Sequence, residues 1–257
     1  MKYMVFIMML VSMAFCITAE MSETYRIGSG TELEVNNING DITIERIDGN
    51  NIIIDIVKKT KKDRTELEKV TVDITSGETF VVKTRYLEDN VDVSVDIALK
   101  VPDNIMEVAI ENVNGTIDIE GITAEINIDN ANGDITVTEV NGTVEVDLAN
   151  GDVRIEGDAI IEDVELANGS ISAEVRALAE DGAQFELANG TIRIYILESL
   201  NADIEARIVM GNLKVHDLSI DYTKQKSNSI EGTLNDGGPL IEIGAATGNI
   251  SIYRLKD

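Results

Sequence analysis

The stretch Val146-Asp-Leu-Ala-Asn-Gly-Asp-Val-Arg-Ile155 indicates the architecture of the chain, because near-copies of it return further along the sequence. Val164-Glu-Leu-Ala-Asn-Gly-Ser-Ile-Ser-Ala173 follows 18 residues later, and Phe185-Glu-Leu-Ala-Asn-Gly-Thr-Ile-Arg-Ile194 follows after a further 21. Repetition at a near-fixed period of this size is typical of a solenoid, in which each coil buries its apolar face only when the next coil stacks on it.

An Asn-Gly pair marks each repeat. Glycine supplies the positive φ that a tight corner requires, and asparagine amides stacked one coil apart can hydrogen-bond along the rod. The sequence therefore predicts a structural turn ladder rather than a ligand site. Its members are Asn114, Gly115, Asn132, Gly133, Asn150, Gly151, Asn168, Gly169, Asn189 and Gly190. Further coil glycines are expected at Gly211, Gly232 and Gly248, and Asn39-Gly40 resembles an earlier copy.

Apolar and polar residues alternate within each repeat. Alternation places Val146, Leu148, Val153 and Ile155 inside the coil and Asp147 outside it. The predicted fold class is all-β: a single-stranded β-solenoid, β-helix-like or β-roll-like, with 18–21 residues per coil and an N-terminal β-hairpin cap. About eight coils at a strand spacing of about 4.8 Å would form a rod roughly 40 Å long.

The region before the repeats is less regular. It contains the strand Ile52–Val57, a short helix at 63–69, and three alternating runs expected to form antiparallel hairpins up to Val101. A polar stretch at 222–228 is expected to loop out of the stack. We therefore divide the chain into a signal peptide (1–19), a strand-rich cap with the first coil (20–109) and the solenoid repeats (110–257). The last two form one continuous domain.

The N-terminus is typical of an export signal. Lys2 precedes an apolar stretch that ends at Ile17, which suits a signal peptide better than a membrane span, and cleavage is expected after Ala19. Cys16 raises the alternative of a lipoprotein, although Phe15 is bulky for that signal. The expected location is secreted or associated with the cell surface or envelope. Membrane contact is expected only through the N-terminal segment, if it is uncleaved or lipidated.

The formal net charge of −26 argues against binding to nucleic acid and to anionic lipid, since both are bound through Lys and Arg. It favours cations and basic partners. Cys16 is the only cysteine, so no disulfide is expected within the chain.

Catalytic and metal-binding motifs are absent from the sequence. Asp134 and Asp152 lie on neighbouring coils and suggest calcium, but too few oxygen ligands accompany them. His216 is the only histidine and is expected on the surface of its strand. No nucleophile elbow, phosphate loop or metal-ligand cluster is visible. We therefore expect a non-enzyme with no cofactor, with a carbohydrate-active β-helix enzyme that uses an acidic groove as the alternative.

Three features together resemble the DUF4097 family of adhesin-like β-strand-repeat proteins. They are Asp48-Gly49 with the strand and charged segment that follow it, the strand that ends at Val101-Pro102, and Val113-Asn-Gly-Thr-Ile-Asp-Ile with its copies. The resemblance covers about residues 30–255. It implies a location at the cell envelope and carries over no catalytic residues.

The combined expectation is an exported, non-catalytic interaction or adhesion module on a rigid acidic rod. Its partner would be an envelope polymer or a surface protein of unknown identity. A third hypothesis is self-assembly, in which strand edges near Ile250–Tyr253 at the open C-terminal end of the solenoid pair with another copy.

Overall fold

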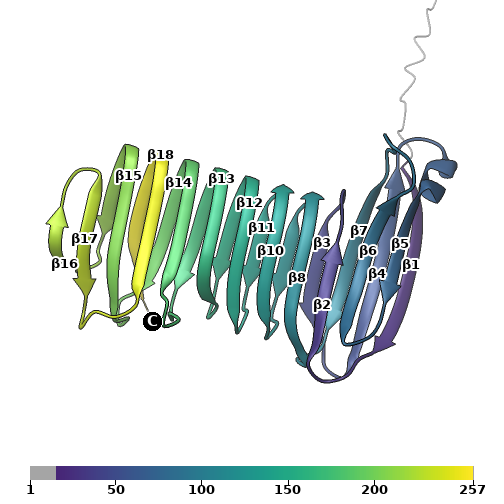
Figure 1. Ribbon diagram of the computed structural model, residues 1–257, viewed down its shortest axis with the longest axis horizontal. Helices are drawn as coiled ribbons and strands as arrows, with labels where there is room; N and C mark the ends of the chain where they lie inside the picture. The colour runs from purple at the N-terminus through teal and green to yellow at the C-terminus, as the bar shows by residue number, and fades with distance from the viewer. Residues whose placement is uncertain (1–15, 257) are drawn as a thin grey trace, which may run out of the picture.

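A computed structural model describes residues 16–256, which form an all-β solenoid (Figure 1). Hydrogen bonds join its 18 strands into one continuous sheet that folds back on itself. Each coil has two runs of strand separated by a glycine corner, and we call these runs the first limb and the second limb. The solenoid fold and its stacked register, expected from the repeats, are confirmed.

Most first-limb strands pair in parallel with the coils on either side, whereas the pairs at both ends are antiparallel. In spatial order from the N-terminal end, the first limb contains β5 (Val70–Thr75), β6 (Thr79–Tyr86), β2 (Thr31–Asn36), β8 (Ile105–Asn114), β10 (Glu125–Asn132), β12 (Thr143–Glu156), β13 (Ile160–Val175), β14 (Ala183–Leu197), β18 (Leu240–Leu255), β15 (Ala202–His216), β17 (Ser229–Leu234) and β16 (Asp221–Gln225).

The second limb follows the same rule, with antiparallel pairs at its N-terminal end. In the same direction it contains β1 (Ile17–Arg26), β4 (Asn51–Thr60), β7 (Ser94–Val101), β3 (Ile42–Arg46), β9 (Ile117–Glu120), β11 (Ile135–Thr138), and then the second halves of β12, β13, β14, β18 and β15. The remaining element is η1 (Arg64–Lys69), a 3-10 helix within the expected range 63–69.

The core lies between the two limbs and consists mainly of Ile, Val and Leu. Val146, Leu148, Val153 and Ile155 are all buried, while Asp147 is exposed, as the alternation predicts. Because equivalent residues pair directly on successive coils, each buried side chain packs on its counterpart above and below. β-Branched side chains suit this narrow interior, since they fill a pleated surface with little rotamer freedom to lose.

The coils do not stack in chain order at the C-terminal end. β18 lies between β14 and β15 and pairs in parallel with both, and Figure 1 shows the yellow β18 between the two green strands. The hypothesis of an open edge near Ile250–Tyr253 is therefore wrong. The last coil of the stack is β15, and its second half, from about Val209 to His216, has no partner strand on its outer side among the described residues.

Two further expectations for this end need correction. Only residues 226–228 of the stretch 222–228 form a loop, because 222–225 belong to β16, which forms a hairpin with β17 outside the last coil. Gly232 lies in that hairpin and not in the glycine column, whereas Gly40 does belong to the column through its contact with Gly115.

The N-terminal end agrees with the sequence in its elements but not in all their pairings. β5 and β6 form the expected antiparallel hairpin, but β6 and β7 do not pair with each other. They lie on opposite limbs and pair in parallel with β2 and β3 respectively. The boundary expected between residues 109 and 110 falls inside β8.

Most of the expected signal peptide lies outside the described residues. Its last four residues, Cys16–Ala19, are described, and Ile17–Ala19 pair with Thr60, Lys59 and Lys58 of β4. Across residues 16–256, no helix has both the length and the apolar character needed to cross a membrane.

Candidate functional site

The predicted asparagine ladder is present at the corners between the limbs. Nδ2 of Asn132 donates a hydrogen bond to Oδ1 of Asn114, and Asn150 donates in the same way to Asn132. The donor–acceptor distance is 3.0 Å in both bonds. Asn168 and Asn189 continue the series at 3.0 and 3.2 Å. Each amide thus donates to one neighbour and accepts from the other, so the chain of hydrogen bonds runs along the rod.

The structure explains why the ladder ends where it does on each side. Asn114 donates a hydrogen bond to Oδ1 of Asn39 at a distance of 2.8 Å, and Asn39 in turn donates to the hydroxyl of Tyr86. That hydroxyl donates to the backbone carbonyl of Val93, which fixes its position. At the other end Thr247 pairs with Asn189 and has no amide to extend the series. The ladder therefore satisfies its own polar groups along the corner.

The glycines beside the ladder allow coils to approach closely. At Gly169, φ is +144°, and a Cβ there would lie 1.7 Å from the carbonyl oxygen of Gly151 on the preceding coil. Gly115, Gly133 and Gly190 have the same relation to their neighbours. Only glycine fits this column, for both a steric and a conformational reason.

Asp134 and Asp152, the two aspartates considered as calcium ligands, accept hydrogen bonds from the backbone of the following coil. Oδ1 of Asp134 accepts a hydrogen bond from the backbone N–H of Asp152 at 2.9 Å, and Asp152 accepts from that of Ser170 at 2.8 Å. Among residues 16–256, no group of three or more His, Cys, Asp and Glu side chains is suited to hold a metal ion.

His216 is half-buried and belongs to an aromatic column. Its ring stacks on that of Tyr253 at 4.6 Å, and Tyr253 stacks on Tyr195 at 5.0 Å, so three consecutive coils contribute one ring each. The column lies on the second limb and supports the stacking of β14, β18 and β15.

A groove with a volume of about 1260 Å³ runs along the first limb. Three columns of side chains define it, and each of the five first-limb strands β8, β10, β12, β13 and β14 contributes one residue to each column. The acidic wall is Glu111, Asp129, Asp147, Glu165 and Glu186. The floor is Asn112, Asn130, Leu148, Leu166 and Leu187. The small-residue wall is Val113, Ala131, Ala149, Ala167 and Ala188.

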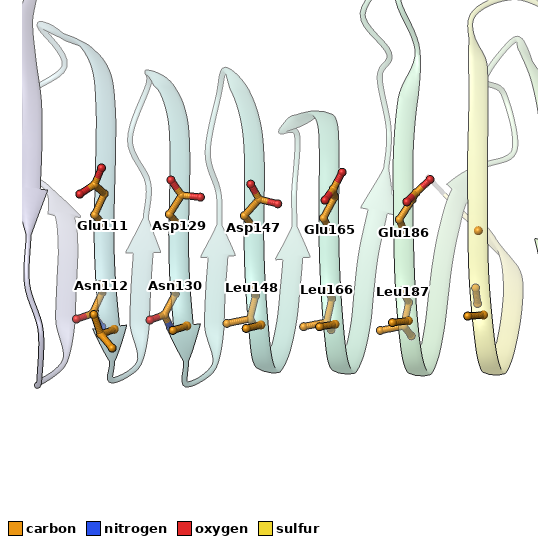
Figure 2. A pocket seen from close by; sticks show the side chains of 18 of the residues that line it. Glu111, Asn112, Asp129, Asn130, Asp147, Leu148, Glu165, Leu166, Glu186 and Leu187 are labelled. Atoms are coloured by element: carbon orange, nitrogen blue, oxygen red, sulfur yellow. The ribbon is translucent and has the colours of Figure 1, made fainter.

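Figure 2 shows the five carboxylates of the acidic wall on successive strands, all pointing to the same side. Because the register is direct, they repeat at the strand spacing of about 4.8 Å. None of the five takes part in an ion pair within the described chain. Lys83 occupies the same column at one end and Arg207 at the other. The acidic wall is thus an unneutralised row bounded by cations.

Crowding of like charges perturbs the middle of the row. Partial burial in the groove raises the pKa of Asp147, and the neighbouring Glu165 and Asp129 raise it further. Burial raises the pKa of Asp163, one column away, to about 6, with further contributions from Glu165, Asp147 and Glu145. A small pocket of about 140 Å³ lies among these acids. A cation placed here would relieve repulsion that the fold itself leaves in place.

The floor changes character along its length. Asn112 and Asn130 are buried, and Nδ2 of Asn130 donates to the carbonyl of Gly115 at 3.1 Å. From Leu148 onward the floor is apolar. The groove thus combines carboxylates with apolar surface, which suits side chains that carry a positive charge on an alkyl stem.

The geometry favours binding over hydrolysis. Neighbouring acids have about the spacing that two glycosidase carboxyl groups require, but those two groups must flank the bond that is cleaved. All five carboxylates lie on one wall, as Figure 2 shows, and the small-residue wall consists of alanines and one valine. The arrangement is a repeated surface in which each coil offers the same group.

Sequence analysis missed this row, although a signal for it exists. Each acid stands three residues before a ladder asparagine, from Glu111 before Asn114 to Glu186 before Asn189. The alternation places the acids outside, but it does not show that they lie beside a groove.

Residues 27–253 match the family described as Toastrack DUF4097. Among solved structures, one described as a "putative adhesin" from Bacteroides fragilis is 14% identical, with 92% of this chain and 97% of that chain covered and a TM-score of 0.46. A "putative cell adhesion protein" from Clostridium sporogenes is 12% identical, with 93% and 100% covered and a TM-score of 0.36. A "putative lipid binding protein" from Parabacteroides distasonis is 12% identical, with 91% and 96% covered and a TM-score of 0.43. Among curated proteins, none matches this chain.

Proposed function

The chain belongs to the DUF4097 family, and from this premise we propose that it is a non-catalytic interaction or adhesion module of the cell envelope or surface. The proposal places the binding surface in the groove of the first limb. The observation that carries it is the row of five unpaired carboxylates along one wall. A rigid rod with one repeated chemical group offers many weak contacts at a fixed spacing to an extended partner.

Charge complementarity selects the partner's chemistry. The acidic wall favours a basic segment of an envelope polymer or surface protein, since complementary charges speed encounter and exclude partners of like charge. Lys83 and Arg207 at the ends of the row favour a basic stretch of limited length. The four steps from Glu111 to Glu186 span about 19 Å, which corresponds to about six residues of extended chain.

The test is co-sedimentation of the protein with isolated envelopes of the source cell across a salt series. The groove variant carries Asp129→Asn, Asp147→Asn and Glu165→Gln. The control variant carries Glu45→Gln, Asp118→Asn and Glu120→Gln, which remove the same charge from exposed positions on β3 and β9 of the second limb. We expect saturable, salt-sensitive binding that the groove variant loses and the control variant keeps. Equal loss in both variants would show a net-charge effect, and no binding at any salt concentration would refute attachment to the cell's own envelope.

A second candidate is self-assembly through the end of the rod. The free edge of β15 begins with two exposed apolar residues, Val209 at 68% and Met210 at 63% exposure. Unpaired strand edges promote association between chains. Sedimentation velocity of the wild type and of Met210→Lys tests this role, because a mass that depends on concentration in the wild type alone would support it.

A further inference from the structure

The described fold begins directly after the apolar N-terminal stretch, with no polar linker between them. That stretch runs from Tyr3 to Ile17 in the sequence, and Ile17 is already the first residue of β1. Ile17 pairs with Thr60, the last residue of β4. If the apolar stretch enters a membrane, the junction between β4 and η1 therefore lies at the membrane surface.

The segment at this junction is the most basic part of an acidic protein. Residues 58–64 read Lys-Lys-Thr-Lys-Lys-Asp-Arg, five basic residues and one acid, in a chain whose net charge is −26. We call this segment the basic loop. Two of its lysines are engaged, since Lys58 donates to the carbonyls of Leu67 and Val70 and Lys59 pairs with Asp96.

The other three basic residues, Lys61, Lys62 and Arg64, are exposed and take part in no ion pair within the described chain. The antiparallel register of β1 and β4 brings Lys61 next to the point where the chain leaves β1 toward its N-terminus. Figure 1 shows η1 beside the start of β1 at this end of the rod.

The geometry points to the basic loop as a binding surface for anionic lipid headgroups, used while the apolar N-terminal stretch is in the membrane. An apolar segment combined with a polybasic patch is a membrane-binding pair that holds more strongly than either part alone. Each Lys or Arg near an anionic surface strengthens binding by a factor of about five.

The acidity of the rest of the chain is compatible with this surface. Three strand steps, about 14 Å, separate β8, where the acidic wall of the groove begins, from β5 at the end of the first limb. Screening at physiological salt has a length of about 8 Å, so an anionic membrane at the basic loop repels these acids weakly.

The surface is restricted to the loop because acids lie nearby. Glu66 and Glu88 are paired with Lys69, whereas Glu68 and Asp89 are exposed and unpaired. Removal of these two charges, with Glu68→Gln and Asp89→Asn, is therefore expected to strengthen binding to anionic vesicles.

The test measures flotation of the full chain with vesicles of phosphatidylcholine alone and with vesicles that contain 30% phosphatidylglycerol. The loop variant carries Lys61→Ser, Lys62→Ser and Arg64→Ser. The matched control carries Lys214→Ser, Lys226→Ser and Lys256→Ser, which remove the same charge from exposed residues of the C-terminal part of the chain. Circular dichroism checks that each variant is folded.

We expect the wild type to prefer the anionic vesicles. The loop variant is expected to lose at least ten-fold in affinity for them, with no change on neutral vesicles, and the control to behave as the wild type. Equal binding of the wild type to both vesicles would overturn the proposal, as would a loop variant that binds anionic vesicles normally. Neither result bears on the groove, whose test uses different residues and a different partner.

Discussion

Nδ2 of Asn150 donates a hydrogen bond to Oδ1 of Asn132, 3.0 Å away on the preceding coil, and Oδ1 of Asn150 accepts one from Asn168 on the following coil. One amide therefore joins three coils. Its contribution depends on having both a donor and an acceptor, which distinguishes asparagine from every charged or apolar substitute.

Asn150→Asp should destabilise the protein more than Asn150→Ala at pH 7. A carboxylate cannot donate to Asn132, and it places a charge against that amide oxygen, whereas alanine only removes the two bonds. We expect losses of about 2 and about 1 kcal/mol in the free energy of unfolding, measured in urea. Asn50→Ala is the control, because Asn50 is exposed and its side chain forms no hydrogen bond in the described chain. Equal losses for the two Asn150 variants would contradict a donor role.

Gly169→Ala should be among the most damaging single substitutions in the solenoid. The new Cβ would lie 1.7 Å from the Gly151 carbonyl oxygen at a φ of +144°, so steric and conformational costs add to about 3–5 kcal/mol. Gly28→Ala is the control, since a Cβ there meets nothing within 4 Å and φ is not in the left-handed range. Urea unfolding of both variants is the measurement. A tolerated Gly169→Ala would show that the coils can move apart.

Asp163→Asn should stabilise the protein at neutral pH. The pKa of Asp163 is raised from 3.8 to about 6, so between these values the native state binds more protons than the unfolded state. The free energy of unfolding therefore rises as pH falls from about 6 to about 4, because the native state takes up the proton of Asp163 first. Above pH 6 the ionised Asp163 destabilises the native state. We expect the variant to gain about 1 kcal/mol at pH 7, a value reduced for solvent screening, and nothing below pH 4.

Thermal unfolding of the wild type and of Asp163→Asn at pH 4, 5, 6 and 7 measures this difference. Asp118→Asn, which removes the same charge from the exposed face of β9, is the matched control. A gain from Asp163→Asn that is the same at pH 4 and pH 7 would contradict the assignment.

Truncation after Pro239 should disrupt the C-terminal part of the rod and not simply shorten it. Removing β18 leaves β14 and β15 without the strand that joins them, so β15 with its hairpin loses its place in the stack. We expect the fragment to aggregate or to be digested by protease beyond β14. Truncation after Leu255, which keeps β18 whole, should leave stability unchanged. A soluble, protease-resistant fragment ending at Pro239 would contradict the order β14–β18–β15.

The repeat from Val146 to Ile155 was sufficient to predict the solenoid, because the period of the glycines and the alternation of apolar residues are local properties. The order of the last coils was not predictable in this way. Thr247-Gly248 and Met210-Gly211 mark equivalent corners on two coils that pair with each other. Because the corners are alike, the position of a coil along the chain does not show which coil it will pair with. The β16–β17 hairpin was not predicted, because the stretch 222–228 is polar. A polar stretch can form a strand outside the last coil, since a strand in that place faces little of the core.

The acidic wall is an intermediate case. The offset of three residues between Glu111 and Asn114, repeated up to Glu186 and Asn189, is present in the sequence. The sequence does not show that these acids line a groove. That depends on the path of the backbone at the corner, which places the floor residues Leu148 and Leu166 between the acids and the alanines.

By itself, the sequence determined the all-β solenoid, the inward and outward faces of each coil, and the amide and glycine columns at the corners. These follow from side-chain period and from backbone conformations that only certain residues adopt. The tertiary structure alone decided that β18 is inserted between β14 and β15, that five carboxylates share one groove, and that the basic loop lies where the chain enters the fold. Such relations join residues distant in the chain, and similar coil edges can pair in more than one order until the whole stack is packed.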